Sequence, residues 1–355
     1  MSKKSKKDKR KKKKTAEMPT PIRLWLTDQS ENRIYIKRED EYGFMRGFSV
    51  SGSKVRIGQK IIENCLENGC DAVIAAGSPQ SNLCSAIAFL AQKNGLLCYI
   101  VEIVTQPTEQ KAINHRLAEE FGAVHYYCYR YETAKIIKGL MRGLIAEQHH
   151  PYLVYGDPYG KGNRPAMMQG YMDVYEEILQ QQKCLGVRFD YIFIGVGTGT
   201  SMAGLISAAG GAMDRIVGIC IAHNAETALI DVQNCLRQKE LFISDESIHL
   251  SEEALCGGYG RSNPKIIQLI EEVYRKTGVR LDPVYTGKAF YGMKIYIKEK
   301  GIKNANILFI HTGGLANYFD YAIENGLYTR DILWRKGVSS ADLYRSFAEE
   351  QKEAA

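Results

Sequence analysis

The 355-residue sequence lacks any apolar run of about 18 residues, the length that a membrane-spanning helix requires. It also lacks a Cys-x-x-Cys pair, although it contains nine cysteines, an odd number that predicts free thiols in a reducing compartment. Its basic start is followed by Thr15-Ala-Glu-Met18 and not by the apolar segment of a signal peptide. These absences exclude a small disulfide scaffold and predict a soluble, cytoplasmic protein.

The sequence has little net charge outside its first residues. Nine lysines and Arg10 against the single acid Asp8 give residues 1–14 a net charge of +9, which leaves about −2 for the rest. The body therefore carries no electrostatic signature of nucleic-acid binding. Residues 1–18 are predicted to be a disordered, solvated basic tail. A tether to nucleic acid or another polyanion, and a nuclear-localisation signal, are the alternatives.

Short apolar runs alternate along the chain with segments of helical periodicity, in a composition of 45% hydrophobic and 25% charged residues that is typical of globular proteins. The predicted strands are Ile34–Lys37, Ala72–Ala76, Leu97–Val101, Val124–Tyr127, Tyr191–Ile194, Ile216–Cys220 and Ile307–Ile310. The predicted helices are Ile57–Glu67, Asn82–Lys93, Thr133–Glu147, Ala166–Gln181, Thr200–Ala209 and Pro264–Thr277. This alternation predicts an α/β fold of parallel sheets with helices on both faces, in which ligands bind beyond the carboxyl ends of the strands.

The loop Gly195–Ser201 has the clearest binding pattern. It follows an apolar strand and opens a helix, and its glycines let the backbone turn sharply and approach an anion. The hydroxyls of Thr198, Thr200 and Ser201 add hydrogen-bond donors. Neither the dinucleotide-binding spacing of glycines nor the Gly-Lys-Ser/Thr of a P-loop is present. The loop predicts a phosphate site, with a closely packed turn as the alternative.

Two further loops precede predicted helices. Lys54 stands at the start of a helix between small residues, where burial and the helix N-terminus lower the pKa of an amine and favour the neutral form that attacks a carbonyl. Taken alone, it is more typical of a solvated lysine. The loop Gly77–Asn82 offers side chains and helix-terminal amides to a carboxylate such as that of an amino acid. Taken alone, Ser81 or Asn82 is more typical of a helix cap.

Together these loops resemble the pyridoxal-phosphate (PLP) enzymes of fold type II, and within them the group of 1-aminocyclopropane-1-carboxylate (ACC) deaminases and D-cysteine desulfhydrases. The resemblance covers about residues 19–325. It rests on eight motifs in family order, which are Pro19–Ile22, Ile36–Asp40, Gly52–Arg56, Gln80–Asn82, Gly197–Ser201, Gly258–Gly260, Asp282–Lys288 and His311–Gly314.

The resemblance implies a site, residue by residue. Lys54 is implied to hold PLP covalently and to act as the general base of the reaction. The phosphate is implied to bind the loop residues Gly197, Thr198, Gly199, Thr200 and Ser201. The substrate carboxylate or the cofactor is implied to lie beside Ser81 and Asn82, and the site to be lined by Tyr259, Tyr285, Thr286 and Thr312. The family also implies a homodimer, a large PLP-binding domain of residues 19–56 and 169–347, and a smaller inserted α/β domain of residues 57–168.

Some positions distinguish this chain within the group. Thr286 and Thr312 stand where ACC deaminases carry Glu and Leu, as they do in the desulfhydrases. A hydroxyl leaves the pyridine ring nearer neutral than a carboxylate would, and the weaker electron sink suits elimination of a good β leaving group. Ser53 and Ile57 depart from the family's Asn and second Lys. The lost lysine removes a cation from the phosphate site, and whether Arg56 replaces it stays open.

We therefore expect PLP-dependent α,β-elimination from a β-substituted amino acid, as in D-cysteine desulfhydrases, which gives a 2-oxo acid, ammonia and the leaving group. The alternatives are ring opening as in ACC deaminases, β-replacement, and a non-catalytic binding protein whose basic arm holds a polyanion. No metal site is expected, because the seven histidines show no ligand spacing with cysteines or acids. His311 is expected to pack in the core.

Overall fold

The computed structural model describes residues 18–105, 112–156 and 163–325. The predicted basic tail, apart from Met18, and residues 326–347 of the predicted large domain lie outside these ranges. Within the described ranges, no helix combines the length and apolar character needed to cross a bilayer.

The larger of two sheets has six strands in the order β1-β2-β10-β7-β8-β9. These are β1 (Ile22–Thr27), β2 (Arg33–Lys37), β10 (Asn306–Ile310), β7 (Tyr191–Val196), β8 (Ile216–Cys220) and β9 (His249–Ser251). Only β1 pairs antiparallel; the other neighbours are parallel. Because side chains alternate along a strand, Ile192 and Ile194 pack with one core cluster and Phe193 with another.

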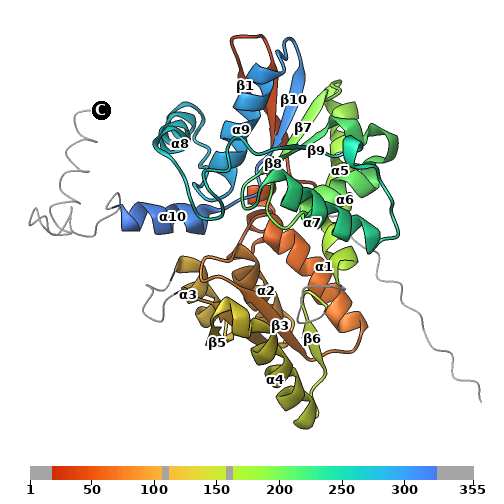
Figure 1. The fold of residues 1–355 in the computed structure, drawn as a ribbon, viewed down its shortest axis with the longest axis vertical. Coiled ribbons are helices and arrows are strands. Elements are labelled where there is room, and N and C mark those ends of the chain that lie inside the picture. The colour runs from red at the N-terminus through yellow and green to blue at the C-terminus, as the bar shows by residue number, and fades with distance from the viewer. Residues whose placement is uncertain (1–17, 106–111, 157–162, 326–355) are drawn as a thin grey trace, which may run out of the picture.

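Helices cover both faces of this sheet (Figure 1). The first core cluster includes residues of α5 (Arg164–Leu185), α6 (Thr200–Ala209) and α7 (Ala225–Arg237). The second includes α8 (Pro264–Thr277) and α9 (Thr286–Glu299). α10 (Leu315–Glu324) follows β10 and contacts α3 (Ile113–Glu120) of the other lobe.

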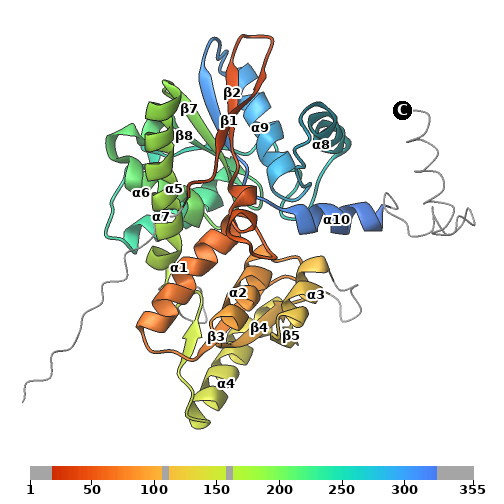
Figure 2. The same ribbon diagram turned by 180° about the vertical axis from the view of Figure 1, so that it is seen from behind.

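The smaller sheet is entirely parallel, in the order β5-β4-β3-β6. Its strands are β3 (Ala72–Gly77), β4 (Leu97–Ile103), β5 (Val124–Cys128) and β6 (Pro151–Leu153), and its other helices are α2 (Asn82–Lys93) and α4 (Thr133–Ala146). Seen from behind, this sheet and its helices form the lower lobe (Figure 2). Two sheets that are parallel except for β1, with helices on both faces, confirm the predicted fold class.

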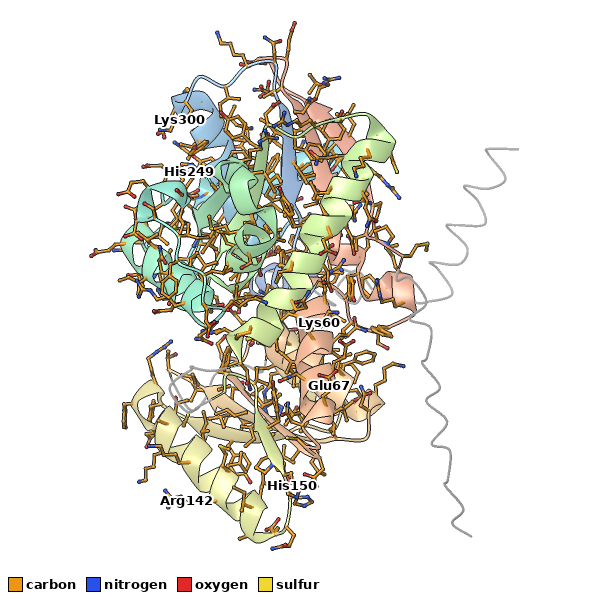
Figure 3. The ribbon with its side chains drawn as sticks, turned by 90° about the vertical axis from the view of Figure 1, so that its right-hand side faces the viewer. Lys60, Glu67, Arg142, His150, His249 and Lys300 are labelled. Atoms are coloured by element: carbon orange, nitrogen blue, oxygen red, sulfur yellow. The ribbon has the colours of Figure 1, made fainter. Side chains whose placement is uncertain are left out.

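α1 (Ser53–Glu67) and α5 run between the two lobes and pack against each other. Lys60 of α1, labelled in Figure 3, forms an ion pair with Asp173 of α5, with Nζ and Oδ2 2.9 Å apart. The predicted domain boundaries, at residues 56/57 and 168/169, fall inside these two continuous helices. One apolar cluster also joins both sheets. The two lobes therefore share a core, and the boundaries stay a prediction.

The first turn of α1 is anchored by a buried ionic network. Arg56 is 2% exposed, and its Nε and Nη1 lie 2.7 Å from Glu39 Oε2 and 2.8 Å from Glu177 Oε1. Lys37 Nζ lies 2.6 Å from Glu177 Oε2 and donates to the carbonyl of Thr20. Burial raises the pKa of Glu39, but Arg56 and Lys37 outweigh it and hold that pKa below its usual range. Two cations and two carboxylates thus balance within the fold.

Every predicted strand and helix is present: α2, α6, α8 and β8 have the predicted ends, and the ends of the others differ by a few residues at most. The elements that the sequence analysis did not predict are β1, β6, β9, α3, α7, α9 and α10. β6 and β9 have three residues each, too few to show a period of two. All nine cysteines are free, as expected.

Candidate functional site

The predicted phosphate loop follows β7 and forms the N-terminus of α6. Gly199 has a φ of 73°, and a Cβ added there would lie 2.8 Å from the backbone nitrogen of Val232, so only glycine fits. No side chain caps α6. Its first amides have no acceptor within the helix, and they carry the positive end of the helix dipole. Thr198 is exposed and Ser201 half-buried beside them. The loop therefore has the donors that an anion requires.

Lys54 lies in the first turn of α1, directly against the His311–Gly314 loop. Ser53 N donates to the carbonyl oxygen of Thr312 at 3.0 Å. Gly52, with a φ of 106°, allows this contact, because an added Cβ would lie 3.1 Å from the same oxygen. Burial and then the charge of Arg164 lower the pKa of Lys54 to about 8. The structure thus gives Lys54 the shifted amine that sequence reasoning anticipated.

Arg164 lies beside the predicted phosphate loop. Its Nη1 donates to Thr200 Oγ1 at 2.7 Å, and its charge acts on Lys54. Asp231, whose pKa burial raises, is an acid near Arg164. Arg56 is instead paired with the carboxylates of Glu39 and Glu177. Two neighbouring cations, Lys54 and Arg164, favour binding of an anion between α1 and α6.

Three tyrosines gather around the same region. Tyr285 donates to the hydroxyl of Tyr259 at 2.9 Å, and their rings meet edge to face with centroids 5.7 Å apart. Burial raises the pKa of Tyr285, so its hydroxyl stays protonated. The Tyr155 ring lies 5.2 Å from the guanidinium carbon of Arg164. Burial, and then the electrostatic influence of Cys84, raise the pKa of Tyr155 to about 12.

Lys288 positions the turn that carries Tyr259. It is fully buried, and its Nζ donates to the carbonyl oxygens of Ile221 at 2.7 Å and Gly258 at 2.8 Å. Burial lowers the pKa of Lys288 to about 8. A second amine of lowered pKa therefore exists in the fold, but two carbonyls hold it in place.

The predicted carboxylate loop lies between β3 and α2. Ser81 caps α2 by accepting from Cys84 N at 3.3 Å. Asn114 of α3 holds this loop, because its amide nitrogen donates to Gln80 O at 3.0 Å and to Asn82 Oδ1 at 2.9 Å. The same nitrogen lies 3.1 Å from Oδ1 of Asn317 in α10. Asn114 thus connects the loop to both lobes.

Thr286 and Thr312, the threonines that distinguish this chain within the group, have different environments. Thr286 is 1% exposed, and its hydroxyl donates to Asp282 Oδ2 at 2.6 Å and accepts from Asp282 N. The hydroxyl proton of Thr286 is therefore already donated to Asp282. Burial raises the pKa of Asp282. Thr312 is half-buried beside the start of α1.

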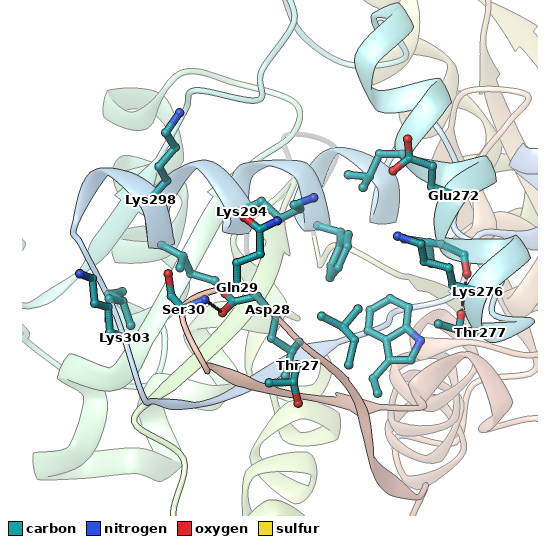
Figure 4. A pocket seen from close by; sticks show the side chains of 18 of the residues that line it. Thr27, Asp28, Gln29, Ser30, Glu272, Lys276, Thr277, Lys294, Lys298 and Lys303 are labelled. Atoms are coloured by element: carbon teal, nitrogen blue, oxygen red, sulfur yellow. Dashed lines mark hydrogen bonds between the residues drawn. The ribbon is translucent and has the colours of Figure 1, made fainter.

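One surface pocket, of about 780 Å³, lies elsewhere, between the β1–β2 turn, α8 and α9 (Figure 4). Lysine side chains, among them Lys294 and Lys298, surround it, and it contains none of the predicted site residues. His311 is 1% exposed, with Nε2 3.0 Å from the carbonyl oxygen of Arg280, as the predicted core role requires.

Known proteins that are similar to this chain share one family. Residues 13–313 match the family described as "Pyridoxal-phosphate dependent enzyme". A protein of Pyrococcus abyssi, provisionally named ACC deaminase, is 32% identical over 298 residues, which are 82% of this chain and 87% of that protein. The ACC deaminase of Bradyrhizobium sp. (strain BTAi1) is 28% identical over 327 residues, 86% of this chain and 95% of its own length.

Two further relatives extend the comparison. The mitochondrial bifunctional D-cysteine desulfhydrase/ACC deaminase of Arabidopsis thaliana is 27% identical over 322 residues, 86% of this chain and 78% of that protein. The crystal structure of an ACC deaminase homologue superposes with a TM-score of 0.73 at 28% identity, over 86% of this chain and 93% of that one.

The chain belongs to the pyridoxal-phosphate-dependent enzymes. Its relatives place it, within that family, in the group of ACC deaminases and D-cysteine desulfhydrases. The residues present fit the cofactor: the uncapped α6 terminus and Arg164 suit its phosphate, and the amine of lowered pKa on Lys54 suits its aldehyde.

Sequence reasoning missed Arg164, Tyr155 and Asn114. Tyr155 and Arg164 follow the carboxyl end of β6, which is parallel to β3 and therefore opens on the same edge of the sheet. Strand order would have pointed to this segment, but β6 is too short to be recognised. Asn114 gives no local signal, because its partners lie about 30 and about 200 residues away.

The lowered pKa of Lys54 predicts how its reactivity depends on pH. In the cofactor-free protein, we expect modification of Lys54 by an amine-acylating reagent, followed by peptide mass analysis, to accelerate about tenfold per pH unit up to about pH 8 and then to level off. Arg164→Gln removes a cation that disfavours the charged amine, and should move this midpoint to higher pH. A midpoint of the wild-type pH profile near 10.5, the ordinary lysine value, would contradict the lowered pKa of Lys54.

Proposed function

We propose that this enzyme catalyses α,β-elimination from a β-substituted amino acid, with D-cysteine as the representative substrate. The products are a 2-oxo acid, ammonia and the β substituent. The Arabidopsis relative named for both desulfhydrase and deaminase activities supports a reaction of this type. The observation that carries the choice is the pair Thr286 and Thr312, which place uncharged hydroxyls where the ACC deaminases of the group have Glu and Leu.

The chain's own residues have separate tasks in this reaction. Lys54, whose lowered pKa makes the neutral amine accessible, removes the proton from Cα. Ser81, Asn82 and the first amides of α2 orient the substrate carboxylate. PLP, when bound, supplies the electron sink that makes this carbon acidic. Arg164 and the α6 terminus hold its phosphate.

The tyrosine pair is suited to the leaving group. Tyr285 donates to Tyr259, so the Tyr259 proton stays available to the substrate. Tyr259 is 39% exposed and can meet a group that leaves toward solvent. The β substituent departs with the electrons of its bond to carbon. One water then converts the unsaturated amine into the 2-oxo acid and ammonia.

Product analysis tests the proposal. The purified enzyme is incubated separately with D-cysteine, L-cysteine and ACC, and 2-oxo acid, ammonia and sulfide are quantified. We expect D-cysteine to give equal amounts of pyruvate, ammonia and sulfide, with kcat/KM at least about tenfold above the value for ACC.

Other outcomes would identify the alternatives. Formation of 2-oxobutanoate from ACC at a rate above that of pyruvate from D-cysteine would establish ring opening instead. Loss of pyruvate in the presence of a second thiol, with a new thioether in its place, would establish β-replacement. Protein that binds no PLP and captures polyanions with a steep dependence on salt would support the binding-protein alternative.

A further inference from the structure

Glu102, His115 and His125 converge in the smaller lobe, outside the proposed reaction. They come from β4, α3 and β5 respectively, and their side chains are 4%, 1% and 6% exposed. One carboxylate oxygen, Glu102 Oε2, lies 2.6 Å from His115 Nδ1 and 2.8 Å from His125 Nδ1. The three potential ligand atoms all lie within 4.8 Å of one another. Among the described residues, these two histidines are the only basic side chains that contact Glu102.

Hydrogen bonding alone satisfies this cluster poorly. A neutral imidazole has one proton, and if Nδ1 uses it to donate to Glu102, Nε2 is left with a lone pair. Both Nε2 atoms are buried and have no hydrogen-bond partner within the described chain. His115 Nε2 also lies 3.2 Å from Oε1 of Glu119. A lone pair would thus face a carboxylate oxygen, which is unfavourable at low dielectric.

We propose that Glu102, His115 and His125 form a binding site for one divalent transition-metal ion of the zinc class. With the ion on Nδ1, the proton of His115 moves to Nε2, where Glu119 can accept it. A metal-bound histidine that donates its other N–H to a carboxylate is the usual arrangement around zinc. The same ion would neutralise the carboxylate of Glu102.

The donor set and its spacing define the class of ion. Two imidazoles and one carboxylate suit zinc or cobalt, whereas magnesium and calcium prefer oxygen ligands throughout. Metal–ligand distances of about 2.0–2.2 Å place tetrahedral ligands about 3.3 Å apart. The present separations of 2.6 and 2.8 Å must therefore open by about half an ångström on binding. Water would fill the fourth position.

The position of the cluster suggests what the metal would do. It would tie α3 to β4 and to β5, the edge strand of the smaller sheet. His115 follows Asn114, which holds the carboxylate loop. A bound ion would thus fix the helix that positions Asn82. Sequence spacing predicted no metal site, because these ligands come from three separate elements.

Cobalt binding tests the proposal with a spectroscopic readout. Untagged, cofactor-loaded enzyme is freed of metal with a chelator and titrated with Co²⁺. We expect one Co²⁺ per chain with the visible bands of a low-coordinate N/O site, displaced by Zn²⁺. Glu102→Gln, which keeps the shape of the side chain, and His125→Gln should each weaken Co²⁺ binding at least about tenfold.

His149→Asn is the matched control. His149 Nδ1 also lies 2.9 Å from a carboxylate oxygen, that of Asp71, but on the surface, and the neighbouring His150 contacts Asp71 through its backbone nitrogen. This variant should bind Co²⁺ as the wild type does. Absence of the bands, equal affinity in wild type and E102Q, or bands of cobalt bound to thiolate would overturn the proposal. If H125Q fails to fold, E102Q decides alone.

Discussion

Lys54→Ala should abolish covalent attachment of the cofactor and lower kcat by about 10³-fold or more. The variant loses both the amine that bonds to the aldehyde and the base that takes the Cα proton, and general-base catalysis alone contributes about 10²–10⁴-fold. Borohydride reduction of the loaded protein, followed by peptide mass analysis, locates the attached cofactor. The visible absorption band of the bound cofactor should disappear as well.

Two other lysines make this prediction specific. Lys60 lies on the same helix and forms an ion pair with Asp173, and Lys60→Ala should keep both attachment and turnover. Lys288 is the competing amine, since burial also lowers its pKa to about 8. Attachment of the cofactor at Lys288, or an unchanged absorption spectrum in Lys54→Ala, would disprove the assignment of Lys54 as the residue that binds the cofactor covalently.

Arg56→Met should lower the free energy of unfolding by about 3–5 kcal/mol, because it leaves the buried carboxylates of Glu39 and Glu177 with Lys37 as their remaining cation in this network. The midpoint of denaturant unfolding measures the effect. Arg38→Met is the control: Arg38 pairs with Asp40 and Glu41, but its side chain is 18% exposed, and we expect a loss of no more than about 1 kcal/mol.

The pH dependence of this difference gives a second check. In the wild type, the pKa of Glu39 is lowered, so its contribution to stability is present above the ordinary carboxylate pKa of about 4 and is lost as the pH falls further. In Arg56→Met, burial favours the protonated acid, and acidification relieves the imbalance. The difference in free energy of unfolding between wild type and Arg56→Met should therefore become smaller from about pH 7 toward about pH 4. Equal destabilisation by Arg56→Met and Arg38→Met at about pH 7 would disprove the network's role.

Much of the candidate site follows from short stretches of sequence. The turn before α6 needs glycine at 199, and the spacing of hydroxyls and glycines around it is visible without a structure. Lys54 is conspicuous because it begins a helix between small residues. The strands of both sheets follow from apolar runs of four or five residues. Each of these features depends on neighbours along the chain, which is what a sequence displays directly.

Arg56 and Arg164 show where this reasoning stops. The sequence leaves open whether Arg56, two residues from Lys54, replaces the lost cation at the predicted phosphate site. In the fold, Arg56 points into the carboxylates of Glu39 and Glu177, and Arg164 reaches Thr200 instead. Residues two positions apart on a helix point to different faces. Lys54 and Arg56 therefore point apart in space although they are close in the sequence.

Sequence alone is therefore enough to predict the alternation of strands and helices, the glycine turn before α6 and the role of Lys54. Packing was needed to show that Arg164 contacts Thr200, that Asn114 holds the loop of Ser81 and Asn82, and that two histidines share Glu102. Local periodicity depends on residues that are close together in the sequence. The meeting of side chains from separate elements depends on how sheets and helices pack, and no spacing along the chain records that packing.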